Sequence, residues 1–358
     1  MKIAKKCLTT IVLGTCFVFS AIPSSAYSSI LRKEVEIPRK YAGMSMDEIC
    51  REEKKLPSEE LISEIKKVEK IDSSAENTYL LTMLAALKEK DTHFSKGELL
   101  QMIQDPETGN GLNETLVQIY ADENLDRKGL IQLLDNDNID LQKKETIVCL
   151  AQLSQEELSD VFEKHDNILS VRAMQQIAVN DNKKAIQLAR PILNNVKGQS
   201  DEKLISACLG AASYYENNTG LKIRSFELEK KNTIGTMKKI FLESENDLVK
   251  DQAFYAMSRI CDYDTFSYMI ESDEVDFDLK VSAIERNIGK MIEQIEKASS
   301  KKDVQVILKA MKLHPICEVG EQLQKAVDSG KITSDKEIAA TIDYVKNEGL
   351  KGVYKYEK

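Results

Sequence analysis

The chain has 358 residues, of which 42% are hydrophobic and 30% charged, with no tryptophan and a net charge of −9 at pH 7. This acidity argues against nucleic acid or an anionic membrane surface as a partner, because both are bound through basic surfaces. A basic or neutral protein is compatible with the charge. A sugar is less favoured, since carbohydrate sites commonly stack sugar rings on tryptophan.

Residues 1–26 have the three parts of a secretory signal peptide. Three lysines within the first six residues are followed by an apolar stretch from Leu8 to Ile22, and small residues precede a predicted cleavage after Ala26. The apolar stretch is too short to span a membrane comfortably, and no later segment is apolar for long enough. We therefore expect an exported chain, secreted or at the cell surface, that begins at Tyr27 and has no transmembrane helix.

A second interpretation of this segment rests on Cys16. Residues 13–16, Leu-Gly-Thr-Cys, loosely resemble a bacterial lipobox, which would make Cys16 a lipidated N-terminus. Thr15 is a poor residue just before such a cut, and the apolar stretch continues beyond Cys16, where a lipoprotein normally becomes polar. Cleavage after Ala26 is the favoured interpretation, and a lipoprotein is the alternative.

The remainder is predicted to be helical apart from its ends. Residues 27–57 are polar and charged, which predicts an extended lead-in. From residue 58 to residue 347, good helix formers predominate and helix starts and stops recur, which predicts an all-α domain. Residues 348–358 are left as a C-terminal tail.

A pattern recurs six times between residues 95 and 290. Each time a small residue is followed by bulky apolar ones and preceded by a short apolar helix and a turn rich in Asp or Asn. The six small residues, spaced by 31, 27, 34, 46 and 30 positions, are Thr115, Thr146, Ala173, Ala207, Ala253 and Ala283. Such a period is typical of an α-solenoid, whose antiparallel helix pairs bury their apolar faces only by stacking. The longest interval predicts an insertion near 217–231, and the flanking residues 58–94 and 300–347 would be capping pairs.

Residues 246–260, NDLVKDQAFYAMSRI, are the clearest copy of this pattern, and residues 171–174 and 279–284 are weaker copies. Their order of Asp, Val, a basic residue, spaced alanines and Ile resembles the HEAT-repeat superfamily, especially its short bacterial type. The family's Arg position holds Lys250 and Lys280 here, which is a departure. The resemblance implies a HEAT-like solenoid that serves as a binding scaffold, sometimes as an accessory to an enzyme. It implies no reaction.

No catalytic or cofactor motif is present, and we expect neither a cofactor nor a metal. Residues 135–140 suggest a calcium loop but lack its glycine and its final glutamate, which favours a polar turn that caps the next helix. The three histidines lack a metal-ligand partner at helical spacing. A dyad of His165 with Glu163 or Asp166 is weighed against a surface histidine in a charged turn, and the surface histidine is favoured.

Five cysteines follow the predicted cleavage site: Cys50, Cys149, Cys208, Cys261 and Cys317. Their odd number, wide spacing and lack of any CxxC pair argue against a disulfide framework. Cys149 and Cys208 are expected to be small buried hydrophobes. A bridge between Cys208 and Cys261 is left open.

Aromatic residues concentrate between residues 214 and 277. Aromatics at helical spacing usually belong to the core, but some of these could project as binding anchors. The candidates are Tyr214, Tyr215 and Tyr255. Three basic residues could join them or instead form a stacking ladder along the second helices: Lys250, Arg259 and Lys280.

These observations together favour a non-enzymatic, exported scaffold that binds a protein or peptide along its helical repeats. Two alternatives stay open. The first is a secreted enzyme or enzyme accessory that acts on cell-wall or host glycans with a site assembled across repeats. The second is a structural or assembly factor of a cell-surface complex.

Overall fold

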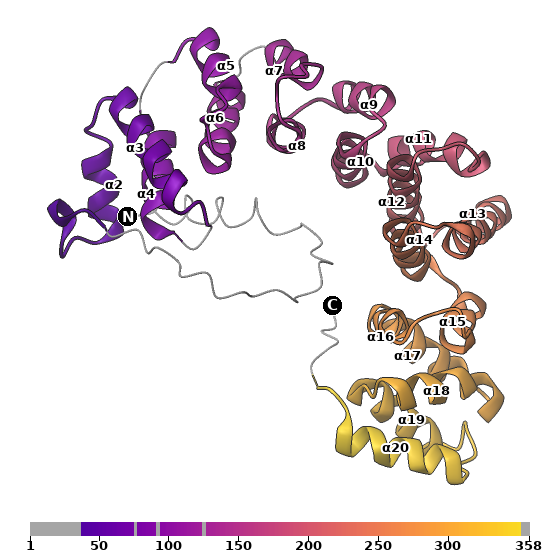
Figure 1. The fold of residues 1–358 in the computed structure, drawn as a ribbon. Helices are drawn as coiled ribbons and strands as arrows, with labels where there is room; N and C mark the ends of the chain where they lie inside the picture. The colour runs from indigo at the N-terminus through magenta and orange to yellow at the C-terminus, as the bar shows by residue number, and fades with distance from the viewer. Residues whose placement is uncertain (1–36, 75–76, 91–93, 124–126, 352–358) are drawn as a thin grey trace. The chain divides into compact units, whose positions relative to one another are not determined.

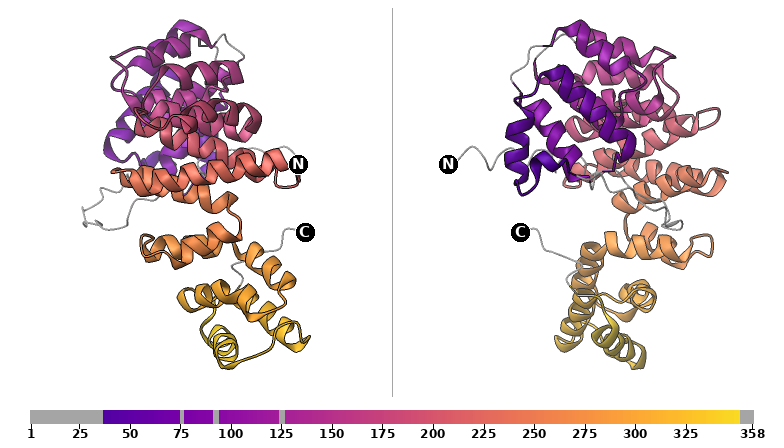
Figure 2. Two further views of the ribbon diagram at one scale, coloured as in Figure 1. Left: turned by 90° about the vertical axis from the view of Figure 1, so that its right-hand side faces the viewer. Right: turned by 60° about the vertical axis from the view of Figure 1, so that its left-hand side comes forward.

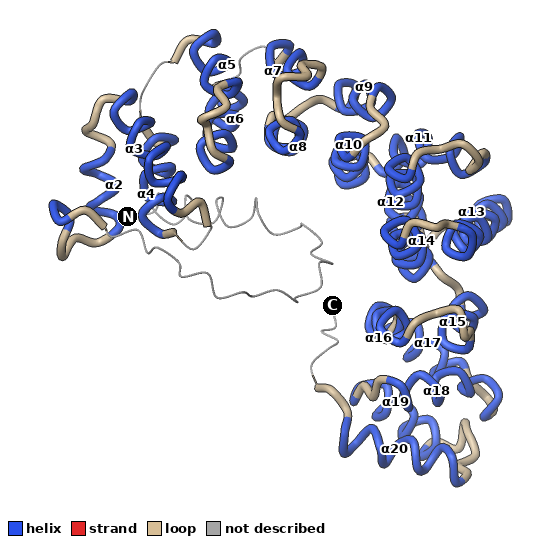
Figure 3. The backbone as a smooth tube through the Cα atoms, viewed as in Figure 1, coloured by secondary structure: helices blue, strands red, loops and turns tan. Residues whose placement is uncertain are grey.

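The computed structural model describes residues 37–74, 77–90, 94–123 and 127–351, so the predicted signal peptide, Cys16 and the first ten residues of the lead-in lie outside the described part. Within these ranges the chain is all-α, as predicted, with nineteen α-helices, two 3-10 helices and no strand (Figure 3). A single backbone bridge joins Ile316 to Leu350. None of the helices in these ranges combines the length and the apolar character needed to cross a bilayer.

The chain divides into two compact units at Lys90. The first contains η1 (Arg39–Tyr41), α2 (Met46–Glu53), α3 (Ser58–Ile71) and α4 (Thr78–Lys88). Residues 27–57 are predicted to be an extended lead-in, but α2 lies within them. The prediction is therefore wrong for the residues of this helix. A capping box starts this helix: Ser45 accepts from the backbone N–H of Glu48, whose carboxylate accepts in return from the backbone of Ser45.

The first unit closes around a buried carboxylate. Glu53 is fully buried, and one of its oxygens accepts from the hydroxyls of Tyr41 at 2.5 Å and Tyr79 at 3.1 Å. Burial and this carboxylate raise the pKa of both tyrosines. The three side chains therefore link η1, α2 and α4 through buried polar contacts.

The second unit begins with six helix pairs. Their bounds are α5 (Lys96–Gln104), α6 (Asn110–Asp122), α7 (Lys128–Leu134), α8 (Leu141–Leu150), α9 (Gln155–Lys164), α10 (Ile168–Asn180), α11 (Asn182–Asn194), α12 (Asp201–Asn217), α13 (Arg224–Glu243), α14 (Asp247–Ile260), α15 (Tyr263–Glu271) and α16 (Phe277–Arg286). Each odd-numbered helix packs on the even-numbered helix that follows it, and the even-numbered helices also contact one another in chain order (Figure 1). We call the even-numbered helices α6 to α16 the second helices.

The predicted helix pairs are found where the pattern placed them. All six small residues lie in second helices, and five are buried, whereas Thr146 is half-buried beside the buried Ile147. The turn at residues 135–140 does cap the next helix, since the Asp140 carboxylate accepts from the backbone N–H of Lys143. Near residues 217–231, much of the extra length lies in α13, which has 20 residues.

Close approach of three helices occurs at Gly210 in α12. A Cβ placed there would lie 2.8 Å from the Met174 sulfur on α10 and 3.0 Å from the Ala185 carbonyl oxygen on α11. Only a glycine fits this contact without displacement of a neighbour.

Two buried lysines connect consecutive pairs. Lys143 and Lys203 occupy the third position of α8 and α12, and 4% and 8% of their surface is exposed. The Lys143 ammonium donates to the carbonyl oxygens of Ile103 at 3.3 Å and Asp105 at 2.6 Å, at the end of α5. Lys203 donates to the Phe162 carbonyl near the end of α9 and lies 4.1 Å from the centre of the Phe162 ring. Each lysine thus satisfies terminal carbonyls of the preceding pair's first helix.

The second unit ends with α17 (Ile288–Lys297), η2 (Lys301–Val304), α18 (Gln305–Leu313), α19 (Cys317–Asp328) and α20 (Lys336–Glu348). Helix α19 packs on α17 and α20, and α18 also packs on α20. Figure 2 shows these C-terminal helices, orange to yellow, from two further sides. The predicted C-terminal tail is described up to residue 351, and its Leu350 exchanges backbone hydrogen bonds with residues 315 and 317. The described start of this tail is therefore held to the start of α19.

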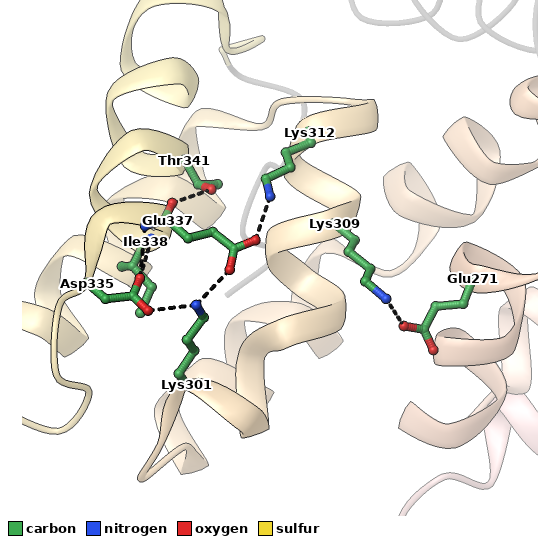
Figure 4. Close-up of polar contacts among 8 residues, drawn as sticks. All are labelled: Glu271, Lys301, Lys309, Lys312, Asp335, Glu337, Ile338 and Thr341. Carbon is green, nitrogen blue, oxygen red and sulfur yellow. Dashed lines mark hydrogen bonds and ion pairs between the residues drawn. The ribbon is translucent and has the colours of Figure 1, made fainter.

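Ion pairs join these last helices (Figure 4). Lys301 pairs with Asp335 at 2.6 Å and with Glu337 at 2.7 Å, and Lys312 also reaches Glu337 at 2.6 Å. Lys309 pairs with Glu271 of α15. The lysines hold the pKa values of Asp335 and Glu337 below their usual range. Because all these groups are paired and exposed, we assign them to helix packing.

Candidate functional site

Tyr215, one of the predicted binding anchors, is fully buried. Its ring centre lies 5.3 Å from that of Phe226 on α13, and its hydroxyl accepts from Thr233 at 3.3 Å. The prediction that Tyr215 projects as an anchor is therefore wrong, because both its ring and its hydroxyl are used between α12 and α13.

Tyr214 is half-buried in the same aromatic cluster. Its ring meets those of Tyr215 and Phe226 at 5.1 and 5.9 Å in edge-on geometry. Such contacts stabilise packing, so most of this ring supports the α12–α13 contact rather than a ligand.

Tyr255, by contrast, lies on a partly free face of α14. It is half-buried and shares that face with Leu248, Gln252 and Arg259, at helical spacings of three or four residues. The guanidinium carbon of Arg286, from α16, lies 5.1 Å from the centre of the Tyr255 ring. This is cation–π distance, and it joins the face of α14 to that of α16.

Arg259 joins the same face to α12 through an ion pair with Glu216. A similar pair, Arg172 with Glu145 at 2.9 Å, connects α10 to α8. Arg259 thus makes a contact between neighbouring second helices, the role that the alternative interpretation gives to all three basic residues.

The other two basic candidates do not lie in such a cross-helix pair in the contacts described. Lys250 lies 3.8 Å from Asp247 of its own helix, and Lys280 is half-buried in the first turns of α16. Around α14, Lys250 lies nearly opposite Gln252 and Arg259, so it stands away from the face formed around Tyr255.

Three consecutive second helices therefore present one connected surface, which we call the second-helix face. It combines apolar, amide and charged side chains that are half-buried or exposed. Its members are Ile205, Leu209, Glu216, Leu248, Gln252, Tyr255, Arg259, Val281, Glu285 and Arg286. Contacts between neighbouring helices fix their register, and the mixture of an aromatic, arginines and aliphatic residues is the kind found at protein interfaces.

His165 is paired, but not with the carboxylates that lie beside it in sequence. It follows α9 with 15% of its side chain exposed, and its Nε2 lies 3.7 Å from Asp135 of the preceding turn. Burial lowers its pKa, and the nearby Asp135 opposes that effect. Asp166 instead lies 3.6 Å from the Lys203 ammonium. The expected surface histidine is thus mostly covered and belongs to the junction between α7 and α9.

All five cysteines after the predicted cleavage site are free thiols, so Cys208 and Cys261 do not form a bridge. Both are buried, and burial raises the pKa of Cys208 to about 12. Cys149 is only half-buried, which corrects the expectation for that residue.

Two further observations concern metal binding and cavities. In the described ranges, no group of three or more His, Cys, Asp or Glu residues is arranged to hold a metal ion. A shallow cavity of about 370 Å³ lies at the end of α5, lined by Gln101, Met102, Gln104 and Asp105. It contains neither the His165–Asp135 pair nor the second-helix face.

Comparison with protein families, with curated proteins and with solved structures gives no match. The class of protein therefore rests on the fold and its surface: an all-α protein whose helices pack mainly on their neighbours in the chain.

Proposed function

We propose that this chain is an exported, non-enzymatic scaffold, a HEAT-like α-solenoid that binds a protein or peptide through its second-helix face. The observation that carries the proposal is the connection of α12, α14 and α16 by the Glu216–Arg259 pair and the Arg286–Tyr255 contact. These contacts hold exposed side chains of three helices in a fixed arrangement. A preorganised surface loses less conformational entropy on binding than a mobile one.

Site-specific photo-crosslinking tests this function. A photoreactive residue in place of Gln252 lies on the second-helix face. The matched control is a photoreactive residue in place of Lys239, which is exposed on α13, the first helix of the α13–α14 pair. In culture medium and cell-wall extract of the native host, we expect position 252 to crosslink a discrete partner and position 239 not to do so. Equal crosslinking from both positions, or none from position 252, would contradict the proposal.

Export rests on the sequence of residues 1–26. N-terminal analysis of protein recovered outside the cell should find Tyr27 as the first residue. A lipid-modified Cys16 would support the lipoprotein alternative, and recovery of the intact N-terminus only from the cell interior would contradict export.

The His165–Asp135 pair is the observation that favours the alternative of an enzyme or enzyme accessory acting on glycans. A histidine oriented by a carboxylate can transfer protons if a substrate reaches it. Only 15% of the His165 side chain is exposed, which limits the access of a substrate, so we prefer the scaffold. Hydrolysis of cell-wall glycan by the full chain that is abolished in His165→Gln would reverse this preference.

A further inference from the structure

Two large apolar side chains are exposed at the beginnings of neighbouring second helices. Leu248, at the second position of α14, is 65% exposed, and Phe277, at the first position of α16, is 59% exposed. Their helices are in contact. The start of α14 does not depend on the Leu248 side chain, since Asn246 caps this helix through its own side chain.

The two helices run in the same direction, which brings these first turns together. At their far ends, the Asn287 amide, just after α16, donates to the Ser258 carbonyl of α14 at 3.2 Å. At their near ends, burial and the carboxylates of Asp247 and Asp276 raise the pKa of Asp251. Leu248 and Phe277 therefore lie at the same end of the pair, on neighbouring helices whose axes are roughly 8–10 Å apart when packed.

The surroundings of the two side chains are strongly acidic. Residues 244–252 and 272–280 together contain seven acidic and two basic residues, a local charge of −5 within a chain of −9. Acids in the first turn of a helix are expected, because they interact favourably with the helix dipole. Asp276, however, makes no capping hydrogen bond although it stands at the capping position, so its carboxylate is available to a partner.

We propose that the first turns of α14 and α16 dock a basic amphipathic helix of the partner protein. This inference rests on the proposed scaffold function and specifies the chemistry of its partner. Apolar residues seven positions apart on a helix are separated by about 10 Å, which is comparable to the spacing of the packed helices that carry Leu248 and Phe277. Lysines or arginines flanking those residues would meet the surrounding carboxylates, and the charge complementarity favours this partner over an acidic one.

The probe is a synthetic helical peptide of leucine and lysine with one apolar face, labelled for fluorescence anisotropy, and its matched control has glutamate in place of lysine. We expect the full chain to bind the lysine peptide and not the glutamate peptide. Leu248→Ser with Phe277→Ser should weaken binding by roughly tenfold or more, because two buried apolar contacts are lost. Asp276→Asn with Asp278→Asn should also weaken binding and reduce its dependence on salt.

Leu228→Ser is the matched surface control. Leu228 is 60% exposed on α13, but residues 222–231 around it have four basic and two acidic residues. Binding should be unchanged in this variant, and circular dichroism should show native helix content in every variant. Equal binding of both peptides, no binding by the wild-type chain, or loss of binding only in Leu228→Ser would each overturn the inference. A partner crosslinked from position 252 while the lysine peptide fails to bind would leave the scaffold function intact and refute only this partner chemistry.

Discussion

Substitution of Gly210 by alanine tests the packing that brings the second helices together. Alanine in place of glycine inside a helix normally stabilises it by about 1 kcal/mol. At Gly210 the added methyl would lie 2.8 Å from the Met174 sulfur and 3.0 Å from the Ala185 carbonyl oxygen. The thioether can move, but the carbonyl belongs to the backbone of α11, and overpacking of this kind costs about 1–3 kcal/mol. The net result should lie between nearly neutral and a loss of about 2 kcal/mol.

Gly235→Ala is the matched comparison, because Gly235 lies inside α13 with no neighbouring heavy atom within 4 Å of the added Cβ. It should gain about 0.5–1 kcal/mol from helix propensity alone. The difference between the two variants then isolates the overpacking cost, about 1–3 kcal/mol. Urea unfolding followed by far-UV circular dichroism measures both. If Gly210→Ala stabilised the protein as much as Gly235→Ala, helices α10, α11 and α12 would not meet as described.

Three further predictions concern ionisable groups. Burial lowers the pKa of His165 from its usual 6.5, so the unfolded chain binds this proton more readily and stability falls as the pH drops below about 6.5. The urea midpoints at about pH 7.5 and about pH 5.5 should differ less in His165→Gln than in the wild-type chain. An equal difference in both would contradict the effect assigned to His165. Glu337→Gln removes two ion pairs and should lower the thermal midpoint more in low salt than in high salt. The control Glu321→Gln changes an exposed residue of α19 and should not show this salt-dependent loss. Maleimide labelling read by peptide mass mapping should modify the three half-buried cysteines before Cys208 and Cys261, and early labelling of either buried thiol would refute its burial.

The positions of the helices were largely predictable, because apolar spacing and capping residues are local signals. The start of α2 carries such a signal too: Ser45 and Glu48 have the spacing of a capping box, which would have corrected the extended lead-in. The polar composition of this segment favoured an extended lead-in over a helix. The composition is polar because the helix buries few of its residues, Ile49 and Glu53 among them.

The orientation of side chains on those helices could not be predicted. Tyr215 and Tyr255 have the same chemistry and both lie in second helices, yet one is fully buried and the other is half-buried. Which side of a helix is covered depends on where its neighbours cross it, and that is a property of several distant segments. The Arg259–Glu216 pair is a similar case, because its members are 43 residues apart and no local spacing connects them.

The buried lysines at the third positions of α8 and α12 have a consequence for how the molecule opens. Separation of α8 from α5, or of α12 from α9, would remove an ammonium group from its carbonyl partners, and an unpaired polar group inside a protein is costly. At the same position, α14 and α16 carry Val249 and Leu279, whose separation leaves no such charge behind. Local opening in α5–α12 should therefore involve neighbouring helix pairs together, in larger cooperative units than in α13–α16. Amide hydrogen exchange should then show slow blocks in α5–α12 and smaller, faster ones in α13–α16.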